Sequence, residues 1–422
     1  MRVAVVGSGI SGLTAAYYLR ALHDVHVYES EDQAGGHART FSVEEPNSQL
    51  HLDTGFMVYN NTNYPGFTGL IEELEVEQQD SDMSFGVTCS KCDFEYGNRG
   101  LQSMLAQPSA IFRPSWITIP FQMRKFYTDA RSLLLDDDDE ISLDQFLLKG
   151  RYSDELVRHL VIPLVASVWT TPAAKVGSFP AKYLFGFMDN HCMLSFTERR
   201  VWQTIKGGSQ NYVDSLVSRL PYGVHLNTTV TGINRDASKV TLSFKKRAPL
   251  QFDAVILATH SDQSLSLLSD PSELEFKALG GIKYSESNVY LHTDDSVMPR
   301  RPRAWCSWNY RTDECSSRPE TSQVTYHLNR LQKLDSARNY FVSLNMGGQI
   351  NDDAVLSEFK QSHPMYSKNS LKSQSIIQAL NASHSPTFFA GAYLGHGFHE
   401  DGFQSGLFAA NSLINWSKSI EV

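Results

Sequence analysis

The start of the chain follows a pattern of apolar and polar positions that is typical of a strand, a helix and a second strand. The β-branched run at 3–6 predicts a short buried strand. A helical stretch follows, with apolar residues at three-residue spacing, namely Ile10, Leu13, Ala16 and Leu19. The run "VHVY" predicts the second strand, which leads into Glu29. Together these segments predict a βαβ unit.

Two later apolar runs, "FDAVILATH" (252–260) and "PTFFAGA" (386–392), predict further buried strands. The block at 78–204 is rich in aromatic residues, proline and helix-like stretches, whereas 284–385 holds alternating runs typical of antiparallel strands. We therefore expect an α/β protein with a discontinuous nucleotide-binding domain. Its pieces are 1–77, 205–283 and 386–422, and an α+β substrate domain is inserted at 78–204 and 284–385.

The segment "VVGSGISG" joins the first strand to the first helix and has the spacing of a dinucleotide-binding loop. Gly7 permits a tight turn, Gly9 lets the backbone approach a pyrophosphate, and Gly12 lets the helix pack closely on the strand. The amide groups at the helix N-terminus, with Ser11 among the predicted ligands, then face the phosphates. Glu29 is placed to accept a hydrogen bond from a ribose hydroxyl. Strand, glycines, helix, strand and acid together predict a bound dinucleotide.

Composition narrows the class of protein. Of 422 residues, 41% are hydrophobic, which supports a buried core, and the net charge of −9 argues against a nucleic-acid partner. The five cysteines are odd in number and scattered, so we expect no disulfide framework. No secretory signal is recognisable, and no run approaches the roughly 18–20 apolar residues that span a bilayer. We expect a cytoplasmic protein.

The segment "EDQAGGHART" (31–40) separates the dinucleotide candidates. It resembles the flavin amine oxidase and phytoene desaturase superfamily, in which a Gly-Gly-x-x-x-Thr/Ser stretch wraps the pyrophosphate of FAD. The resemblance implies a Rossmann-type, amine oxidase-like fold with FAD as cofactor. It assigns the pyrophosphate to Gly35, Gly36, Arg39 and Thr40. "HLDTGFMVYN" is similar to the segment beside the isoalloxazine and contributes Gly55, Phe56 and Met57, and "TTVTGI" places Val230 at the adenine.

Several other segments resemble one group within this superfamily, the predicted NAD/FAD-binding amine-oxidase-like proteins. These segments are "DTGFMVYN", "SDMSF", "DNH", "GGSQNYV", "LATHSDQ", "LHTD", "MPRRPRAWCSWNY" and "GFHEDG". Some relatives in that group are encoded beside, or fused to, cyclopropane-fatty-acid-synthase-type methyltransferases. The resemblance therefore implies a methyltransferase as a candidate partner.

The segment "GHGFHEDGFQSG" (395–406) holds two histidines, two acids and four glycines. His396 and His399 are three residues apart, but no further ligand cluster lies in frame, so we expect no metal. In the superfamily that it resembles, a Phe-Ala-Gly strand precedes a loop and a helix that opens over the flavin. The resemblance implies that Gly391, Asp401 and Gly402 contact FAD, with amide groups near Glu400–Gly402 facing the flavin ring.

Four residues are candidates for acid–base chemistry: His399, Glu400, His191 and Tyr310. A histidine suits proton transfer near neutral pH, although each could equally be a structural hydrogen-bonding group. Trp305, Trp308 and Tyr310 are expected on one strand face, which is either core or cavity wall. The superfamily's amine oxidases usually carry a lysine near the flavin, and the comparable position here reads Asn288.

The absence of this lysine favours a hydrophobic small-molecule substrate over an amine. Our first hypothesis is flavin hydride transfer on a lipid or fatty acyl chain, as desaturation or double-bond isomerisation. The second is an amine or amino-acid oxidase that produces imine and hydrogen peroxide. The third is a redox-inactive FAD-binding partner of a methyltransferase.

Two further segments have competing interpretations. "CSKC" (89–92) has the spacing of thioredoxin and zinc-knuckle motifs, but a second such pair is missing, so we expect a turn with two free thiols. The aromatic and basic segment 110–127 suits an interfacial helix that contacts a membrane peripherally. A helix packed inside the substrate domain is the alternative that we favour.

Overall fold

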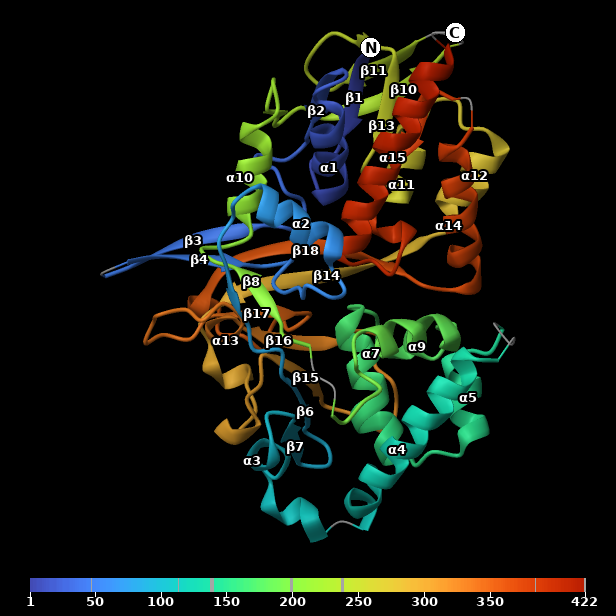
Figure 1. Cartoon of the computed structure of the whole chain (residues 1–422). Helices are drawn as coiled ribbons and strands as arrows, with labels where there is room; N and C mark the ends of the chain where they lie inside the picture. The colour runs from blue at the N-terminus through green and yellow to red at the C-terminus, as the bar shows by residue number, and fades with distance from the viewer. Residues whose placement is uncertain are drawn as a thin grey trace. The chain divides into compact units, whose positions relative to one another are not determined.

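The structure is a computed structural model that describes residues 1–46, 48–112, 114–136, 140–197, 200–236, 239–383 and 385–420. Arg113, in the segment with competing interpretations, lies outside these ranges. The chain divides into two compact units, each built from separate stretches (Figure 1). Unit 1 comprises Met1–Gln79, Ile205–Lys283 and Asn369–Val422, and unit 2 comprises Asp80–Thr204 and Tyr284–Lys368.

A five-stranded parallel sheet forms the centre of unit 1. Its order is β19 (Thr387–Phe389), β13 (Ala254–Leu257), β1 (Arg2–Val6), β2 (Asp24–Tyr28) and β9 (Val224–His225). The apolar runs that predicted strands at 3–6, 252–260 and 386–392 are therefore neighbours in one sheet, as a doubly wound fold requires. The prediction of a Rossmann-type α/β domain is confirmed.

Helix α1 (Ile10–Leu19) lies beside helix α15 (His399–Ile420) in unit 1 (Figure 1). Nine of the ten α1 residues are buried, so this helix depends on cover from both the sheet and α15. The other helices of the unit are α2 (Pro65–Glu73), α10 (Gln210–Ser218), α11 (Ser261–Leu267), α12 (Glu273–Gly280) and η6 (Ala392–Leu394).

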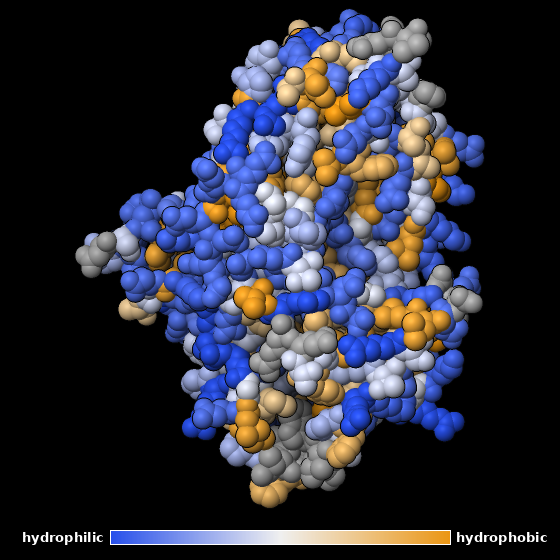
Figure 2. Space-filling model, viewed as in Figure 1, coloured by the Kyte–Doolittle hydropathy of each residue, from blue (hydrophilic) through white to orange (hydrophobic). Residues whose placement is uncertain are grey.

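Two small antiparallel sheets complete unit 1. One is the hairpin of β3 (Thr40–Glu45) and β4 (Ser48–Asp53), which is largely hydrophilic on the face shown in Figure 2. The other comprises β10 (Val230–Arg235), β11 (Val240–Phe244) and β12 (Leu250–Phe252). Short strands β5 (Gln78–Asp80) and β8 (Gln203–Ile205) lie where the chain passes between units.

Helix α14 (Lys368–Asn381) corrects one detail of the expected division. It falls within 284–385, which the sequence assigned to the inserted domain, but it belongs to unit 1. Its side-chain amides explain why. Gln374 Nε2 donates to the carbonyls of Tyr393 and Gly395 at 2.8 and 2.7 Å, and Asn381 exchanges two hydrogen bonds with the Phe389 backbone.

A seven-stranded sheet forms the centre of unit 2. Its order is β18 (Val355–Met365), β14 (Lys283–His292), β17 (Phe341–Leu344), β16 (Gln323–His327), β15 (Trp308–Thr312), β6 (Phe85–Cys89) and β7 (Phe94–Gly97). Strands β14, β17, β16 and β15 pair antiparallel, as the alternating runs predicted, whereas β15 and β6 are parallel.

The first stretch of unit 2 is mainly helical, as predicted for 78–204. Its helices are α3 (Leu101–Met104), η1 (Pro108–Phe112), α4 (Pro114–Leu134), α5 (Leu143–Gly150), α6 (Asp154–Leu156), the π-helical turn η2 (Val157–Val161), α7 (Ile162–Val168), α8 (Ala173–Val176) and α9 (Ala181–Asn190). The second stretch adds η3 (Asp295–Val297), η4 (Pro302–Ala304), α13 (Leu328–Leu331) and η5 (Asp352–Ala354). Within the described ranges, no helix combines the length and the apolar character needed to cross a membrane.

Candidate dinucleotide-binding site

The loop between β1 and α1 has close backbone contacts at two of its glycines. Gly7 has φ +100°, and a Cβ built on it would lie 2.7 Å from the carbonyl oxygen of Ala258. A Cβ on Gly12 would lie 2.0 Å from the Gly7 oxygen. Any side chain at either position would push the loop, the helix or strand β13 apart. The fold itself therefore requires both glycines.

Gly9 differs from its neighbours because the protein does not require it to be glycine. Its φ of −68° suits any residue, and a Cβ there would meet no atom within 4 Å. Among the described residues, no side chain caps the N-terminus of α1, and its first turn holds no acid. Open space beside an uncapped helix N-terminus fits an anionic phosphate that approaches the backbone.

Glu29 lies at the end of β2 and is fixed against this loop. Its Oε2 accepts hydrogen bonds from Ser8 N at 2.9 Å and from Ser8 Oγ at 2.7 Å. Thr228 N donates to the Glu29 carbonyl at 2.7 Å, which holds the segment before β10 alongside. Val230, predicted at the adenine, is the buried first residue of β10. The predicted ribose acid and adenine segment are thus brought together, with Ser8 as a partner that sequence reasoning missed.

The second glycine pair closes onto the first loop. Gly35 N donates to the Ser8 carbonyl at 3.0 Å, and Gly35 pairs with Gly9 as an isolated parallel bridge. Gly36 has φ +59°, and a Cβ on it would lie 3.1 Å from Gly9 Cα. Arg39 Nη2 lies 3.8 Å from Asp32 Oδ1 at the partly exposed edge of this turn. Gly35 and Gly36, two of the residues that the sequence assigned to the pyrophosphate, therefore lie against Gly9.

Thr40 differs from that assignment because its hydroxyl is used inside the protein. Thr40 Oγ1 donates to buried Asp53 Oδ1 at 2.6 Å and accepts a hydrogen bond from Gln210 N at 3.0 Å. Ser209 donates to the same Asp53 oxygen through its N and its Oγ, both at 2.8 Å. Burial raises the pKa of Asp53 to about 6, against which these hydrogen bonds work. The cluster joins the segments "LDTG" and "GGSQ", a contact that the sequence did not predict.

The segment after β4 lies along the Gly35–Thr40 turn. Thr54 N donates to the Arg39 carbonyl at 3.0 Å, and Phe56 N donates to the His37 carbonyl at 2.9 Å. Gly55 is half-buried between these two hydrogen bonds, and Met57 is buried just after them. This segment, predicted beside the isoalloxazine, is therefore held by backbone hydrogen bonds, to which the Thr54 hydroxyl adds a bond to the Arg39 carbonyl at 3.2 Å.

His399 begins α15 and has the contacts of a structural residue. Its ring stacks on Phe56 with centroids 3.7 Å apart, and Nε2 lies 2.8 Å from the Tyr212 hydroxyl. Burial, and secondarily the charge of His37, lowers the pKa of His399 to about 3. The imidazole is therefore neutral at physiological pH. A ring that stays neutral is unsuited to the proton-transfer role that we predicted from the sequence.

Glu400 is occupied in capping another helix. Its two carboxylate oxygens accept from Gly66 N at 3.0 Å and from Phe67 N at 2.8 Å, which are the first amides of α2. Gln404 Nε2 adds a third hydrogen bond at 2.7 Å. A carboxylate at a helix N-terminus stabilises that end through the orphan N–H groups and the helix dipole.

Asp401 and Gly402 shape the loop before α15. Asp401 Oδ2 accepts from Phe398 N at 2.8 Å, and burial raises the pKa of Asp401 to about 6. The N–H of Gly402 donates to the Phe398 carbonyl at 3.0 Å. The amide that was expected to face the flavin at Gly402 is thus used within the first helical turn, a correction to the sequence interpretation.

Glycines let α15 pack directly on α1. A Cβ on Gly402 would lie 2.6 Å from Ile10 Cγ2, and one on Gly406 would lie 2.2 Å from the Ser11 oxygen. Ser405 Oγ lies 3.4 Å from Ser11 Oγ and accepts a hydrogen bond from Gly391 N at 2.9 Å. The predicted ligands Ser11, Gly391 and Gly402 therefore belong to one contact, where the two helices begin beside β19.

The other two acid–base candidates lie in unit 2. His191 Nδ1 lies 2.9 Å from the Phe187 carbonyl, and its ring stacks on Phe187 at 3.9 Å. Tyr310 is buried in β15, and burial raises the pKa of its hydroxyl. Both have the environment of structural residues.

The expectation that Trp305, Trp308 and Tyr310 share one strand face is wrong. Strand β15 begins at Trp308, and Trp305 follows the turn η4, where its indole N–H donates to the Pro299 carbonyl at 2.7 Å. Asn288, which replaces the expected lysine, is an exposed residue of β14 and donates its N–H to Asn345 Oδ1 at 3.1 Å.

The parallel sheet, the glycine loop with its open space and the acid at the end of β2 define a dinucleotide-binding α/β protein. Comparison with known families is more specific: the chain belongs to the flavin-containing amine oxidoreductase family, whose model matches residues 10–414. Membership implies FAD as the cofactor, which confirms the prediction from the sequence. The residues around Gly9 fit its pyrophosphate.

Individual relatives are distant. An L-amino acid oxidase from Bothrops pictus is 24% identical over 293 residues, which cover 64% of this chain and 55% of that protein. The chain thus spans about half the length of the curated relatives that it matches.

Solved structures share the fold over nearly the whole chain. A putrescine oxidase variant aligns with a TM-score of 0.73 at 16% identity, covering 98% of both chains. A CLA-producing fatty acid isomerase from P. acnes aligns with a TM-score of 0.68 at 16% identity, again covering 98% of both.

Proposed function

We propose that this protein is an FAD-dependent oxidoreductase that acts by hydride transfer between a substrate carbon and the flavin. The observation that carries this proposal is the open space at Gly9, beside an uncapped helix N-terminus, in a chain of the flavin-containing family. FAD supplies the redox chemistry when bound. The residues of unit 1 bind and orient it: Glu29 holds the ribose, and the Gly35–Gly36 turn encloses the phosphates.

The substrate that we propose is hydrophobic, with a lipid or fatty acyl chain as the first class and desaturation or double-bond isomerisation as the reaction. Support comes from the residues that the resemblance places near the flavin. Both carboxylate oxygens of Glu400 cap α2, Asp401 bonds its own loop, and His399 is neutral. These groups are poorly placed to hold an ammonium ion, which supports an uncharged, C–H-rich substrate.

A second candidate is supported by the comparisons. Several matched relatives are L-amino acid oxidases. If this chain shares that chemistry, it oxidises an amine or amino acid to the imine and passes the electrons to oxygen, with release of hydrogen peroxide. Asn288, at the position where the superfamily's amine oxidases carry lysine, argues against a close copy of that site.

The experiment begins with the visible spectrum of the purified protein, in which bound oxidised flavin absorbs near about 370 and about 450 nm. The protein is then mixed anaerobically with dispersed fatty acids and phospholipids and, separately, with a panel of L-amino acids and primary amines. If the reaction is desaturation, lipid should bleach the flavin and yield a desaturated chain by mass spectrometry. If it is isomerisation, the hydride returns to the chain, so an isomerised product should form without net bleaching. Bleaching by amino acids with peroxide release on admitting air would establish the second candidate instead.

The same preparation tests the non-enzymatic alternative. Photoreduction with a sacrificial donor should reduce the flavin fully if the protein is an oxidoreductase. A flavin that resists photoreduction, in a protein that co-purifies with a methyltransferase, would replace our proposal with that of a redox-inactive partner. A colourless protein that takes up no added FAD would refute the assignment altogether.

Peripheral membrane contact through 110–127 is a further proposal about partners. Phe126 of α4 packs edge-on against Phe146 and Phe185, so this end of the segment is part of the unit 2 core. Phe112 and Phe121 are 82% and 75% exposed, respectively. Replacing Phe121 by serine should lower co-sedimentation with anionic vesicles, and unchanged sedimentation would exclude contact through this side chain.

A further inference from the structure

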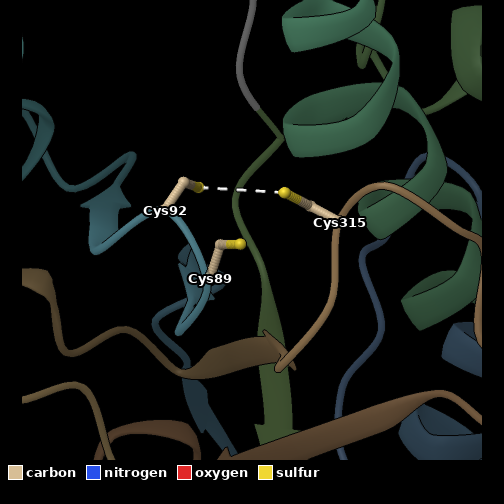
Figure 3. Close-up of side chains that lie close together, drawn as sticks. All are labelled: Cys89, Cys92 and Cys315. Atoms are coloured by element: carbon tan, nitrogen blue, oxygen red, sulfur yellow. Dashed lines mark hydrogen bonds between the residues drawn. The ribbon is translucent and has the colours of Figure 1, made fainter.

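Three cysteine side chains that are distant in sequence converge in unit 2 (Figure 3). Cys89 is the last residue of β6, Cys92 lies in the turn before β7, and Cys315 lies in the loop after β15. Their sulfur atoms all lie within 4.8 Å of one another, and Cys92 Sγ is 4.0 Å from Cys315 Sγ. None of the three forms a disulfide, and Cys89 is buried.

Hydrogen bonds fasten the two loops that present these sulfurs. Strands β6 and β15 run parallel, with Cys89 opposite Thr312. Beyond the strands, Ser90 N donates to the Thr312 carbonyl at 2.9 Å and Ser90 Oγ to Asp313 Oδ1 at 2.7 Å. Lys91 Nζ pairs with Glu314 Oε2 at 2.5 Å. The convergence of the three sulfurs is therefore built by the fold on both sides of the cluster.

A histidine adjoins the cluster from a third element. His159 Nε2 lies 3.7 Å from Cys92 Sγ, although His159 lies outside the mutual group of three sulfurs. It belongs to the π-helical turn η2, a rare geometry that often occurs at functional sites. The Tyr96 hydroxyl donates to the His159 carbonyl at 2.8 Å, and the Phe94 ring lies 5.2 Å from the imidazole, so the turn and the ring are held in place.

Two separations in the cluster suit coordination to one metal ion, and the imidazole would have to move closer to at least one of the other two sulfurs to complete the set. A tetrahedral zinc ion with Zn–S bonds near 2.3 Å and Zn–N bonds near 2.05 Å separates its ligands by about 3.8 Å for two sulfurs and about 3.6 Å for sulfur and nitrogen. The observed 4.0 and 3.7 Å lie close to these values. We propose that Cys89, Cys92 and Cys315, with His159 as the fourth ligand, form a structural zinc site. Three soft thiolates and an imidazole are a ligand set that zinc prefers among common cations.

A disulfide is the competing use of the same sulfurs, and the structure disfavours it. A disulfide bond is about 2.05 Å long, roughly half the separation of Cys92 and Cys315. Zinc would displace each thiol proton to solvent without any redox change. With four protein ligands the ion would keep no open position, so its role would be to clamp the loop after β15 to the β6–β7 turn.

The test measures the zinc content of the purified, full-length chain by mass spectrometry of the metal, and the affinity by competition with a chromophoric chelator. We expect about one zinc per chain in the wild type. Cys92→Ser and Cys315→Ser should each lower the affinity at least about tenfold, and His159→Gln should do so while retaining sulfur ligation. Cys192→Ser is the matched control, because Cys192 is a half-buried cysteine of the same unit that forms no disulfide and lies outside the cluster.

Cobalt provides a second readout that is independent of stability. Tetrahedral thiolate-bound cobalt(II) absorbs at longer wavelength than the flavin, and its band should be lost in Cys92→Ser and persist in Cys192→Ser. Near-ultraviolet circular dichroism checks that each variant is folded. Zinc bound equally by wild type and Cys92→Ser, no stoichiometric zinc in a folded wild type supplied with the ion, or a Cys92–Cys315 disulfide in the native protein would each overturn the proposal.

Discussion

Gly9→Ala separates cofactor binding from folding more cleanly than any other change at the nucleotide loop. The position has φ −68°, which alanine adopts without strain, and its new Cβ would meet no protein atom within 4 Å. The cost of alanine at a helix N-cap and the gain from a stiffer unfolded chain are each below or near 1 kcal/mol and oppose each other. The free energy of unfolding without FAD should therefore change by less than about 1 kcal/mol.

FAD binding should weaken sharply in the same variant, because the methyl group occupies the space that we assign to the pyrophosphate. Loss of one hydrogen bond to a charged phosphate costs about 1.5–3 kcal/mol. That energy corresponds to a roughly 10- to 140-fold higher dissociation constant. Flavin fluorescence quenching during titration of the FAD-stripped protein measures the dissociation constant, and urea unfolding of the same preparation measures stability.

Two other glycines provide matched comparisons. Gly69→Ala lies in the same unit, where a Cβ also meets nothing within 4 Å, and it should leave the FAD affinity unchanged while stabilising α2 by up to about 1 kcal/mol. Gly12→Ala should instead disrupt the fold, since its Cβ would lie 2.0 Å from the Gly7 oxygen. An unchanged FAD dissociation constant in Gly9→Ala would refute our placement of the pyrophosphate.

Three further predictions concern the buried polar groups of unit 1. Burial raises the pKa of Asp53 to about 6 from its usual value near 4, so the stability that this carboxyl contributes is fullest below pH 4 and is lost as the pH rises through 6. Relative to Asp53→Asn, the wild type should lose about 2 kcal/mol of unfolding free energy between about pH 4 and pH 7 in urea unfolding, and a constant difference would contradict this. Glu400→Gln should lower the free energy of unfolding by about 1 kcal/mol, because it weakens the cap of α2, and should change the rate of flavin reduction by substrate less than about twofold. A large loss of rate at unchanged stability would instead identify Glu400 as a proton-transfer residue. His399→Phe should lower the free energy of unfolding by about 1–3 kcal/mol, because it leaves the Tyr212 hydroxyl unpaired. Adding Tyr212→Phe should recover part of this loss in a double-mutant cycle measured by thermal unfolding. Purely additive losses would argue against the hydrogen bond.

The elements of the nucleotide-binding unit could be predicted because their signals are local. A β-branched run, a three-residue apolar spacing and the positions of three glycines identify β1, α1 and their loop within a few turns of chain. Local patterns could not predict which later segments of the chain belong to this unit. The amides of Gln374 and Asn381 tie α14 to the backbone around β19, and nothing in the pattern of α14 itself indicates that partner.

The candidate site shows the same limit at the level of single side chains. Residue types and motif spacing identified the glycines and Glu29, whose positions are set by backbone geometry. Asp53 and Ser209 went unpredicted because the bond between them joins residues 156 positions apart. His399 was considered for proton transfer because the sequence gives its chemistry but not its burial against Phe56 and Tyr212, which is what makes it a neutral, structural group.

The contact between α1 and α15 has a consequence for the making of the protein. Ser11 and Ser405 touch across 394 positions of sequence, and α1 is buried on almost every face only when α15 covers it. At about 5–20 residues per second, a ribosome needs roughly 20–80 seconds to synthesise the intervening chain. Throughout that interval the first helix is without its cover, so apolar surface that is buried in the folded protein stays exposed on the nascent chain. We expect the nucleotide-binding loop to reach its final packing only after α15 has emerged.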